Sequence, residues 1–178
     1  LAKVGIDIKG AKVALQGCGN VGSYAGMYIE EFGAKVVIVG DHTGTITNPD
    51  GIDMKALMAY IPTTPNRGIK GFPGAEATDQ NVLTADVDLL MPCALENQLT
   101  AENANDVKAK VVCEGANGPT TPGADEIFAQ KGITLVPDIL ANSGGVTVSY
   151  YEWVQNLQRD SWSFEEVDEK LHGIMVNI

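Results

Sequence analysis

Residues 12–22 read KVALQGCGNVG, a short apolar run followed by glycines in the spacing GxGxxG. The apolar run predicts a β-strand, and apolar residues at helical spacing over 20–32 predict a helix that Gly33 ends. Residues 35–39 are a continuous, β-branched run, which is typical of a strand buried on both faces. Strand, helix and strand in succession predict a βαβ unit with parallel strands and a right-handed crossover.

Each glycine of the turn has a mechanical reason to be there. Gly17 permits a tight turn out of the strand, Gly19 lets the backbone approach a pyrophosphate, and Gly22 lets the helix pack closely on the sheet. The first amides of the helix and its dipole can hold a diphosphate without a lysine. A lone GxGxxG is a weak signal, but this one follows a predicted strand and opens a predicted helix. The alternative is a glycine-rich turn without a ligand.

Asp41 follows the second predicted strand, 19 residues after Gly22. An acid at this place accepts hydrogen bonds from the adenosine ribose. No lysine or arginine follows before Lys55, so a 2′-phosphate would meet a carboxylate and no cation. The sequence therefore favours NAD over NADP. Asp41 as a loop carboxylate facing water is the alternative, and an arginine from a neighbouring strand would change the cofactor preference.

The rest of the chain continues the alternation of strands and helices. Further strands are predicted at 87–91, 110–113 and 133–136. Further helices are predicted at 53–60 after an Asp53 cap, in 97–107 with Thr100 as cap, at 122–131, at 142–159, and from 164 to the chain end with Ser163 as cap. The segments 42–51 and 62–74 are predicted to be irregular. This pattern predicts an α/β fold with a Rossmann-like, doubly wound, mostly parallel sheet and helices on both faces.

Composition excludes several classes of function. The chain has 178 residues, 44% of them hydrophobic, and a net charge of −11. Such a charge argues against nucleic acid and anionic membranes as partners. There is no apolar run of the ~20 residues that a membrane span needs, and no signal peptide, so we expect a cytoplasmic protein.

Cysteines and histidines do not predict a metal site. Cys18, Cys93 and Cys113 are an odd number without metal-ligand spacing, which favours buried, reduced thiols. His42 and His172 are far apart and lack a suitable partner, so zinc is not expected.

Three segments follow the later predicted strands: PCALEN at 92–97, EGANGPTTP at 114–122 and PDILANSGGV at 137–146. Each holds an asparagine beside small residues. An amide offers both a donor and an acceptor, which suits a nicotinamide carboxamide or a ribose. The alternative for each asparagine is a turn former or a helix cap.

The chain resembles the cofactor-binding, C-terminal domain of glutamate dehydrogenases, within the family of glutamate, leucine, phenylalanine and valine dehydrogenases. The resemblance covers nearly the whole chain and is carried by GCGNVG, Asp41 with the NPDG loop at 48–51, PCALENQ, EGANGPTTP, PDILANSGGV and TVSYYEWVQN at 147–156. Leucine and phenylalanine dehydrogenases look different at ALENQ and EGANGPTTP and are a second possibility. From another class, the alternative is a non-catalytic NAD-sensing module.

The resemblance implies reversible oxidative deamination of L-glutamate to 2-oxoglutarate and ammonia with NAD(P), in a full-length homohexamer. The residues that would bind the cofactor are Gly17, Gly19, Asn20, Val21, Gly22, Asp41, Ala94, Asn117 and Asn142. Val146 and Ser149 would bind the substrate, and Gly144 and Gly145 would let the ring and substrate approach the helix. Val146 and Ser149 are three residues apart and share one helix face, but packing alone would also explain them.

The resemblance also implies that the catalytic lysine, the proton-shuttling aspartate and the substrate-binding lysines lie in an N-terminal substrate domain that is absent here. Among the acids near the crevice, Glu96, Glu114 and Asp138 come with no lysine partner. We therefore predict no catalytic residue in this chain, which would bind cofactor without turning over glutamate. We expect residues 1–160 to be the dinucleotide-binding domain of an excised fragment, and 161–178 a truncated C-terminal helix.

Overall fold

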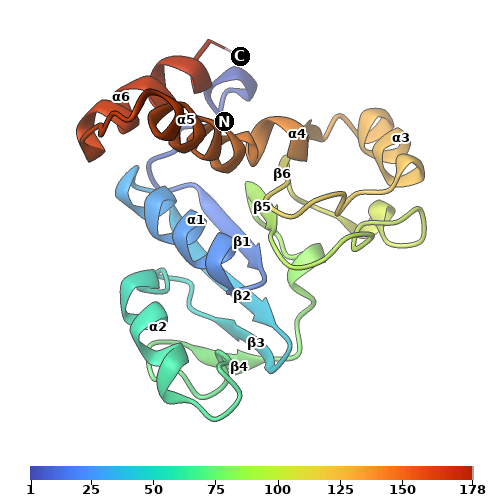
Figure 1. The fold of residues 1–178 in the computed structure, drawn as a ribbon. Coiled ribbons are helices and arrows are strands. Elements are labelled where there is room, and N and C mark those ends of the chain that lie inside the picture. The colour runs from blue at the N-terminus through green and yellow to red at the C-terminus, as the bar shows by residue number, and fades with distance from the viewer. Residues whose placement is uncertain (178) are drawn as a thin grey trace.

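A seven-stranded sheet runs through the molecule in the order β4-β3-β2-β1-β5-β6-β7 (Figure 1). This computed structural model describes residues 1–177. The strands are β1 (Lys12–Gln16), β2 (Lys35–Asp41), β3 (Gly44–Thr47), β4 (Glu76–Thr78), β5 (Leu89–Pro92), β6 (Val111–Cys113) and β7 (Thr134–Val136). The α-helices are α1 (Asn20–Glu31), α2 (Met54–Tyr60), α3 (Pro122–Lys131), α4 (Asp138–Ala141), α5 (Ser143–Gln158) and α6 (Phe164–Met175).

The five strands predicted from sequence form the parallel part of the sheet. β1 pairs in parallel with β2 on one side and with β5 on the other, and β6 continues the parallel sheet to β7. The chain thus leaves β1 in one direction and later returns to its other side. That reversal is the switch point of a doubly wound sheet, where a crevice opens beyond the strand ends. The predicted α/β class and doubly wound topology are confirmed.

Both faces of the sheet are buried, which is why its central strands are apolar without interruption. Leu15 points into a core under α1 and α2, whereas its neighbour Ala14 points into a second core that contains Phe128 of α3. All three side chains are fully buried. Because successive residues of a strand face opposite sides, both must be apolar when helices cover both faces.

Two antiparallel strands at one edge of the sheet were not predicted. β3 falls within the segment 42–51 that was expected to be irregular, and it pairs antiparallel with β2 and with β4. Among its residues only Ile46 is buried, and none of the residues of β4 is. Short strands at an exposed edge carry too little alternation to stand out in the sequence.

The predicted helices differ from the structure in two places. No α-helix begins at Thr100, whose N–H is bound by the side chain of Asn103 at 2.9 Å, and only a short 3₁₀ turn (Ala104–Asp106) follows. The helix expected over 142–159 is α5 (Ser143–Gln158) and agrees to within one residue at each end, although the short α4 before it was not predicted. Helix α6 ends at Met175, and Ile178 lies outside the described residues.

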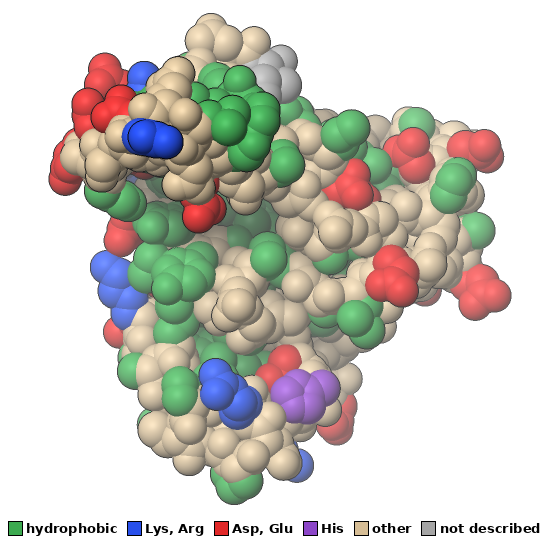
Figure 2. All heavy atoms as spheres, viewed as in Figure 1, with side chains coloured by type: hydrophobic (Ala, Val, Ile, Leu, Met, Phe, Trp, Pro, Cys, Tyr) green, Lys and Arg blue, Asp and Glu red, His purple; other side chains and the backbone are tan. Residues whose placement is uncertain are grey.

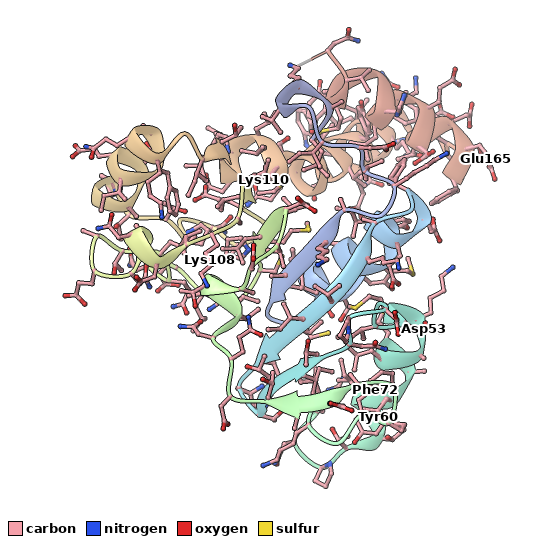
Figure 3. The ribbon with its side chains drawn as sticks, turned by 180° about the vertical axis from the view of Figure 1, so that it is seen from behind. Asp53, Tyr60, Phe72, Lys108, Lys110 and Glu165 are labelled. Atoms are coloured by element: carbon pink, nitrogen blue, oxygen red, sulfur yellow. The ribbon has the colours of Figure 1, made fainter. Side chains whose placement is uncertain are left out.

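Other helix ends agree with the sequence prediction. The Asp53 carboxylate accepts the Ala56 N–H at 2.9 Å and so begins α2 (Figure 3). Ser163 begins α6 with a capping box that Glu166 completes. The segment 62–74 folds back onto α2, where Tyr60 and Phe72 meet edge to face with ring centres 5.5 Å apart (Figure 3).

Helices α5 and α6 lie side by side at one end of the molecule, opposite the end formed by α2, β3 and β4 (Figure 1). The first residues of the chain lie beside this helix pair (Figure 1). Acidic side chains are spread over the face seen in Figure 2, in line with the chain's net charge of −11. No helix among residues 1–177 has both the length and the apolar character for crossing a membrane.

Candidate functional site

The turn between β1 and α1 requires glycine at two positions for the fold itself. Gly17 has a φ of +89°, and a Cβ there would lie 3.0 Å from Ala94. At Gly22, in the first turn of α1, a Cβ would overlap the carbonyl oxygen of Gly17 and crowd Cys93. These two glycines therefore let the strand turn sharply into the helix.

Gly19 has no such internal reason to be glycine. Its φ of −81° suits any residue, and no atom lies within 4 Å of the place where its Cβ would be. The open space lies at the start of α1, where the first N–H groups have no partner inside the helix. An anionic group that approached the backbone closely would explain the glycine and would be favoured by the helix dipole. The turn therefore fits a diphosphate.

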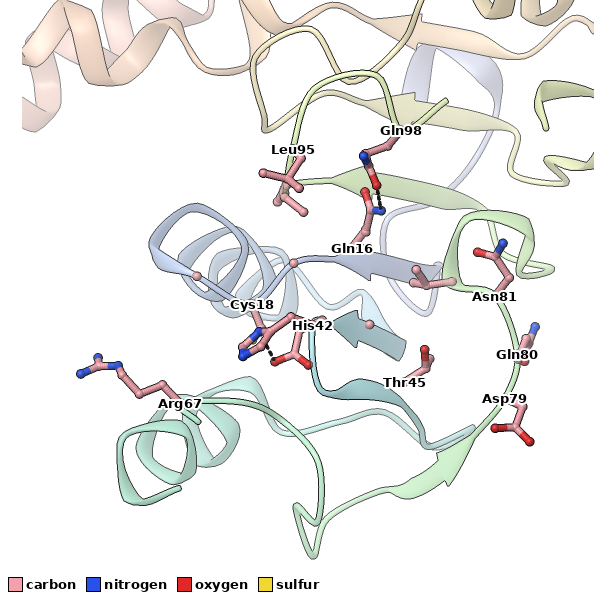
Figure 4. Close-up of a pocket in the computed structure, with 17 residues that line it drawn as sticks. Gln16, Cys18, His42, Thr45, Arg67, Asp79, Gln80, Asn81, Leu95 and Gln98 are labelled. Atoms are coloured by element: carbon pink, nitrogen blue, oxygen red, sulfur yellow. Dashed lines mark hydrogen bonds and ion pairs between the residues drawn. The ribbon is translucent and has the colours of Figure 1, made fainter. Parts of the chain in front are cut away.

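A cavity of about 740 Å³ lies beside the turn, over the ends of β1 and β2 (Figure 4). Its walls come from the glycine turn, from the residues after β2, from the segment 79–82 and from the segment 93–98. This volume falls within the range of about 300–1,000 Å³ that is typical of small-molecule sites.

A second cavity, of about 530 Å³, adjoins the first. Val21, Ala94, Asn117, Asn142 and Val146 contribute to its walls. The segment 93–95 borders both cavities. The site thus has two lobes beside an anion-binding turn, an arrangement that suits two nucleosides joined by a diphosphate.

Asp41 lies in the first lobe, but its carboxylate is already largely engaged. The N–H and hydroxyl of Thr43 donate to Oδ1 at 2.7 and 2.6 Å, and the N–H of Ile69 donates to Oδ2 at 3.0 Å. The side chain is only 7% exposed, and His42 Nδ1 is 3.8 Å away. A carboxylate has about four acceptor positions, so about one remains for a ligand. Asp41 therefore also anchors the segment around Ile69.

Sequence reasoning missed several polar side chains of the first lobe. The Gln16 amide donates to Gln98 Oε1 at 2.8 Å, while Gln16 Oε1 is buried without a hydrogen-bond partner among the described residues (Figure 4). Arg67 also lines the lobe, and its side chain points away from His42 (Figure 4). A glutamine before a glycine turn carries no distinctive sequence signal, and Arg67 reaches the lobe from an irregular segment.

Two of the predicted asparagines meet in the second lobe. Asn142 Nδ2 donates to Asn117 Oδ1 at 2.7 Å. Among the described residues, the NH2 group of Asn117 and the amide oxygen of Asn142 make no hydrogen bond, so the pair keeps a free donor group beside a free acceptor. A donor beside an acceptor is the complement of a primary carboxamide.

Of the two predicted substrate residues, Val146 lines the second lobe and Ser149 does not. Val146 is 70% exposed and lines the second lobe, so it is not a core residue. The Ser149 hydroxyl donates to the carbonyl oxygen of Gly145 at 3.2 Å, one turn back along α5. Ser149, Asn20 and Gly22 do not line either lobe, although Asn20 and Gly22 belong to the turn beside them.

The three thiols lie at the same ends of the strands and are free. Burial raises the pKa of Cys93 to about 12, and it raises the pKa of Cys18 and Cys113 as well. Protonated thiols are poor nucleophiles and poor metal ligands. Among residues 1–177, no cluster of histidines, cysteines and acids could hold a metal ion.

The fold and the site together define an α/β protein of the dinucleotide-binding class. The model of the Glutamate/Leucine/Phenylalanine/Valine dehydrogenase family matches residues 1–178. The chain belongs to this family of oxidoreductases.

Curated relatives are similar over almost the whole chain. The NADP-specific glutamate dehydrogenase A1 of Halobacterium salinarum is 50% identical over 96% of this chain, and the NAD-specific glutamate dehydrogenase of Clostridioides difficile is 50% identical over 98%. The match spans 41% and 42% of those two proteins. The chain therefore spans about two fifths of the length of these relatives.

Solved structures agree with this assignment. The hetero-hexameric glutamate dehydrogenase from Thermus thermophilus, in a Leu-bound form, superposes with a TM-score of 0.89 at 32% identity. Glutamate dehydrogenase from Peptoniphilus asaccharolyticus superposes with a TM-score of 0.80 at 41% identity. Each match covers 99% of this chain, and 41% and 40% of the respective structures.

Proposed function

We propose that this chain is the cofactor-binding domain of a glutamate dehydrogenase, which deaminates L-glutamate oxidatively and reversibly to 2-oxoglutarate and ammonia. Gly19 carries the proposal, because it caps the free amide end of α1, lines the first cavity and has open space where a Cβ would be, so a diphosphate could approach the backbone there. The 50% identity to two glutamate dehydrogenases supports the substrate. We take residues 1–160 as the cofactor domain and the remainder as a C-terminal helical segment.

The two lobes divide the cofactor between them. In this proposal the turn 17–22 holds the diphosphate, Asp41 accepts one adenosine ribose hydroxyl, and Ala94 separates the two nucleosides. Asn117 and Asn142 hold the carboxamide of the nicotinamide, whose ring supplies the hydride-accepting group. Their hydrogen bond of 2.7 Å orients both amides before the ligand arrives.

We propose NAD rather than NADP as the preferred cofactor. Asp41 and Asp79 both line the first lobe and would repel a 2′-phosphate. Arg67 is the one lysine or arginine among the described residues that line this lobe, and its side chain points away from His42 (Figure 4). Overall identity does not separate the two cofactors, since NAD-specific and NADP-specific relatives are equally similar.

The proposed protein is a cytoplasmic homohexamer when complete. Free thiols support a reducing compartment. One face of α5 supports assembly, because Val146, Tyr150, Trp153 and Leu157 follow one another at helical spacing and are all more than half exposed. The Thermus relative is described as a hetero-hexamer, which supports six subunits but not their identity. Val146 and Ser149 remain our candidates for substrate contact.

Calorimetric titration with NADH tests the proposal directly. We expect Gly19→Ala to weaken NADH binding by at least tenfold, since a methyl group would occupy the diphosphate space, with no loss of thermal stability. Gly173→Ala is the matched control, because Gly173 also has open space around it but lies in α6. Equal affinity of Gly19→Ala and the parent would refute the proposed diphosphate site.

Titration with NADPH tests the cofactor preference separately. The parent should bind NADH more tightly than NADPH, and Asp41→Ser should reduce the difference. Tighter binding of NADPH by the parent would show that the preference is wrong while leaving the site itself in place.

A further inference from the structure

Glu114 is a buried acid for which the proposed function has no use. It follows β6 and is 4% exposed, and with Ser23 it is one of two buried polar residues among those described. Its Oε2 accepts the N–H of Asp138 at 2.8 Å, at the start of α4. A buried carboxylate is costly unless it is hydrogen-bonded, so this bond calls for a structural or functional reason.

Asp138 returns a bond to the segment that carries Glu114. Its Oδ2 accepts the N–H of Gly118 at 2.7 Å, and its Oδ1 accepts the N–H of Ile139 at 2.6 Å. Each acid therefore binds a backbone amide of the other's segment. We call these two reciprocal bonds the carboxylate clamp between 114–118 and 138–142.

The two segments that the clamp joins also carry the asparagine pair of the second lobe. Asn117 lies next to Gly118, and Asn142 follows α4, whose four residues begin at Asp138. Asn117 is exposed and Asn142 is half-buried, so neither is fixed by packing on all sides. A four-residue helix has little stability of its own, and the clamp joins it to the end of the sheet.

We propose that Glu114 and Asp138 are positioning residues that fix the Asn117–Asn142 pair and thereby determine the affinity contributed by the nicotinamide half of the cofactor. This inference rests on the proposed cofactor site. The acids need not touch the ligand, because their effect passes through the backbone of both segments. Without them the two amides would have to be ordered when the ligand binds, at a cost in affinity.

The test compares NADH with ADP-ribose, which lacks the nicotinamide. Glu114→Ala should weaken NADH binding by about tenfold, the usual scale for a hydrogen bond to a charged group, and should change ADP-ribose binding less than about twofold. The ratio of the two dissociation constants measures the nicotinamide contribution. Glu114→Gln should keep this ratio near the parent value, because the amide oxygen of glutamine can still accept the Asp138 N–H.

Asp88→Ala is the matched control. The Asp88 carboxylate also accepts a backbone N–H from another segment, that of Lys12 at 3.0 Å, but at the amino ends of the strands. Asp88→Ala removes this bond and the Lys110 ion pair as well, so its general loss of stability should be at least as large as that of Glu114→Ala. The NADH to ADP-ribose ratio should stay at the parent value.

The outcomes separate the two proposals. If Glu114→Ala weakens both ligands equally, or neither, the positioning role is wrong. If Asp88→Ala changes the ratio as much as Glu114→Ala does, the effect is general and the positioning role is also wrong. A parent protein that binds neither ligand contradicts the proposed cofactor site itself.

Discussion

At the scale of single residues, Asp88 ties three strands together at the amino end of the sheet. Its Oδ1 accepts from Lys110 Nζ at 2.8 Å and its Oδ2 from the Lys12 N–H at 3.0 Å. The Lys110 hydrogen bond, more than any other contact, lowers the pKa of Asp88. Three acids of the site, Asp41, Glu114 and Asp138, likewise each accept a backbone N–H from a distant segment.

Asp88 should make stability depend on acid pH. Because its pKa is lower in the folded state, its contribution is complete above the unfolded pKa of about 3.8 and is lost as pH falls through the folded value. We expect Asp88→Asn to lower the urea midpoint at pH 6 and to flatten its decline below about pH 4. Parallel midpoint curves for parent and variant would contradict this.

Residue roles in the glycine turn could be predicted because they follow from spacing along the chain. The three glycines lie within one turn and the start of one helix, so their geometry is local. The bonds of Asp41 could not be predicted, since Ile69 reaches it from 28 residues away. The sequence shows that residue 41 is an acid. It does not show that three hydrogen bonds within the protein already occupy most acceptor positions of the Asp41 carboxylate.

At the scale of elements, two helix glycines offer a comparison. Among residues 1–177, no atom outside the local helix backbone lies within 4 Å of the place of a Cβ at Gly145 in α5 or Gly173 in α6. Both helices carry the conformational cost of glycine. We expect alanine at either position to raise the free energy of unfolding by about 0.5–1 kcal/mol. Thermal unfolding would measure this.

The same two variants should differ in ligand binding. Gly145 directly precedes Val146, which lines the second lobe, and we expect a methyl group there to obstruct the nicotinamide half, so Gly145→Ala should bind NADH more weakly. Gly173→Ala should bind it as the parent does. Unchanged calorimetric affinity in Gly145→Ala would show that the ring does not approach this helix.

Elements with a strong pattern were predicted well, and weakly patterned ones were missed. β1 and β2 are buried on both faces, and their apolar runs mark them clearly. β3 and β4 are short and mostly exposed, so pairing rather than pattern makes them strands. α4 is separate from α5 because Asn142 leaves the helical conformation there.

At the scale of the whole molecule, the site has two cofactor-sized lobes, and no lysine is among the described residues that line them. In the second lobe Glu96 lines the wall, and Glu114 and Asp138 nearby are engaged with backbone amides. We therefore expect this chain to bind NADH but to form none from NAD and L-glutamate, as followed by absorbance. Steady turnover by the purified chain would contradict the prediction that the catalytic groups lie in another domain.

The sequence by itself determined the fold class, the glycine turn and the central strands, because periodicity and spacing are local properties of the chain. Only the tertiary structure decided which distant groups meet. Glu114 and Asp138 are 24 residues apart, and Asn117 and Asn142 are 25 apart. Their contacts depend on strand order and register, since parallel neighbours bring the ends of separate strands to one edge of the sheet.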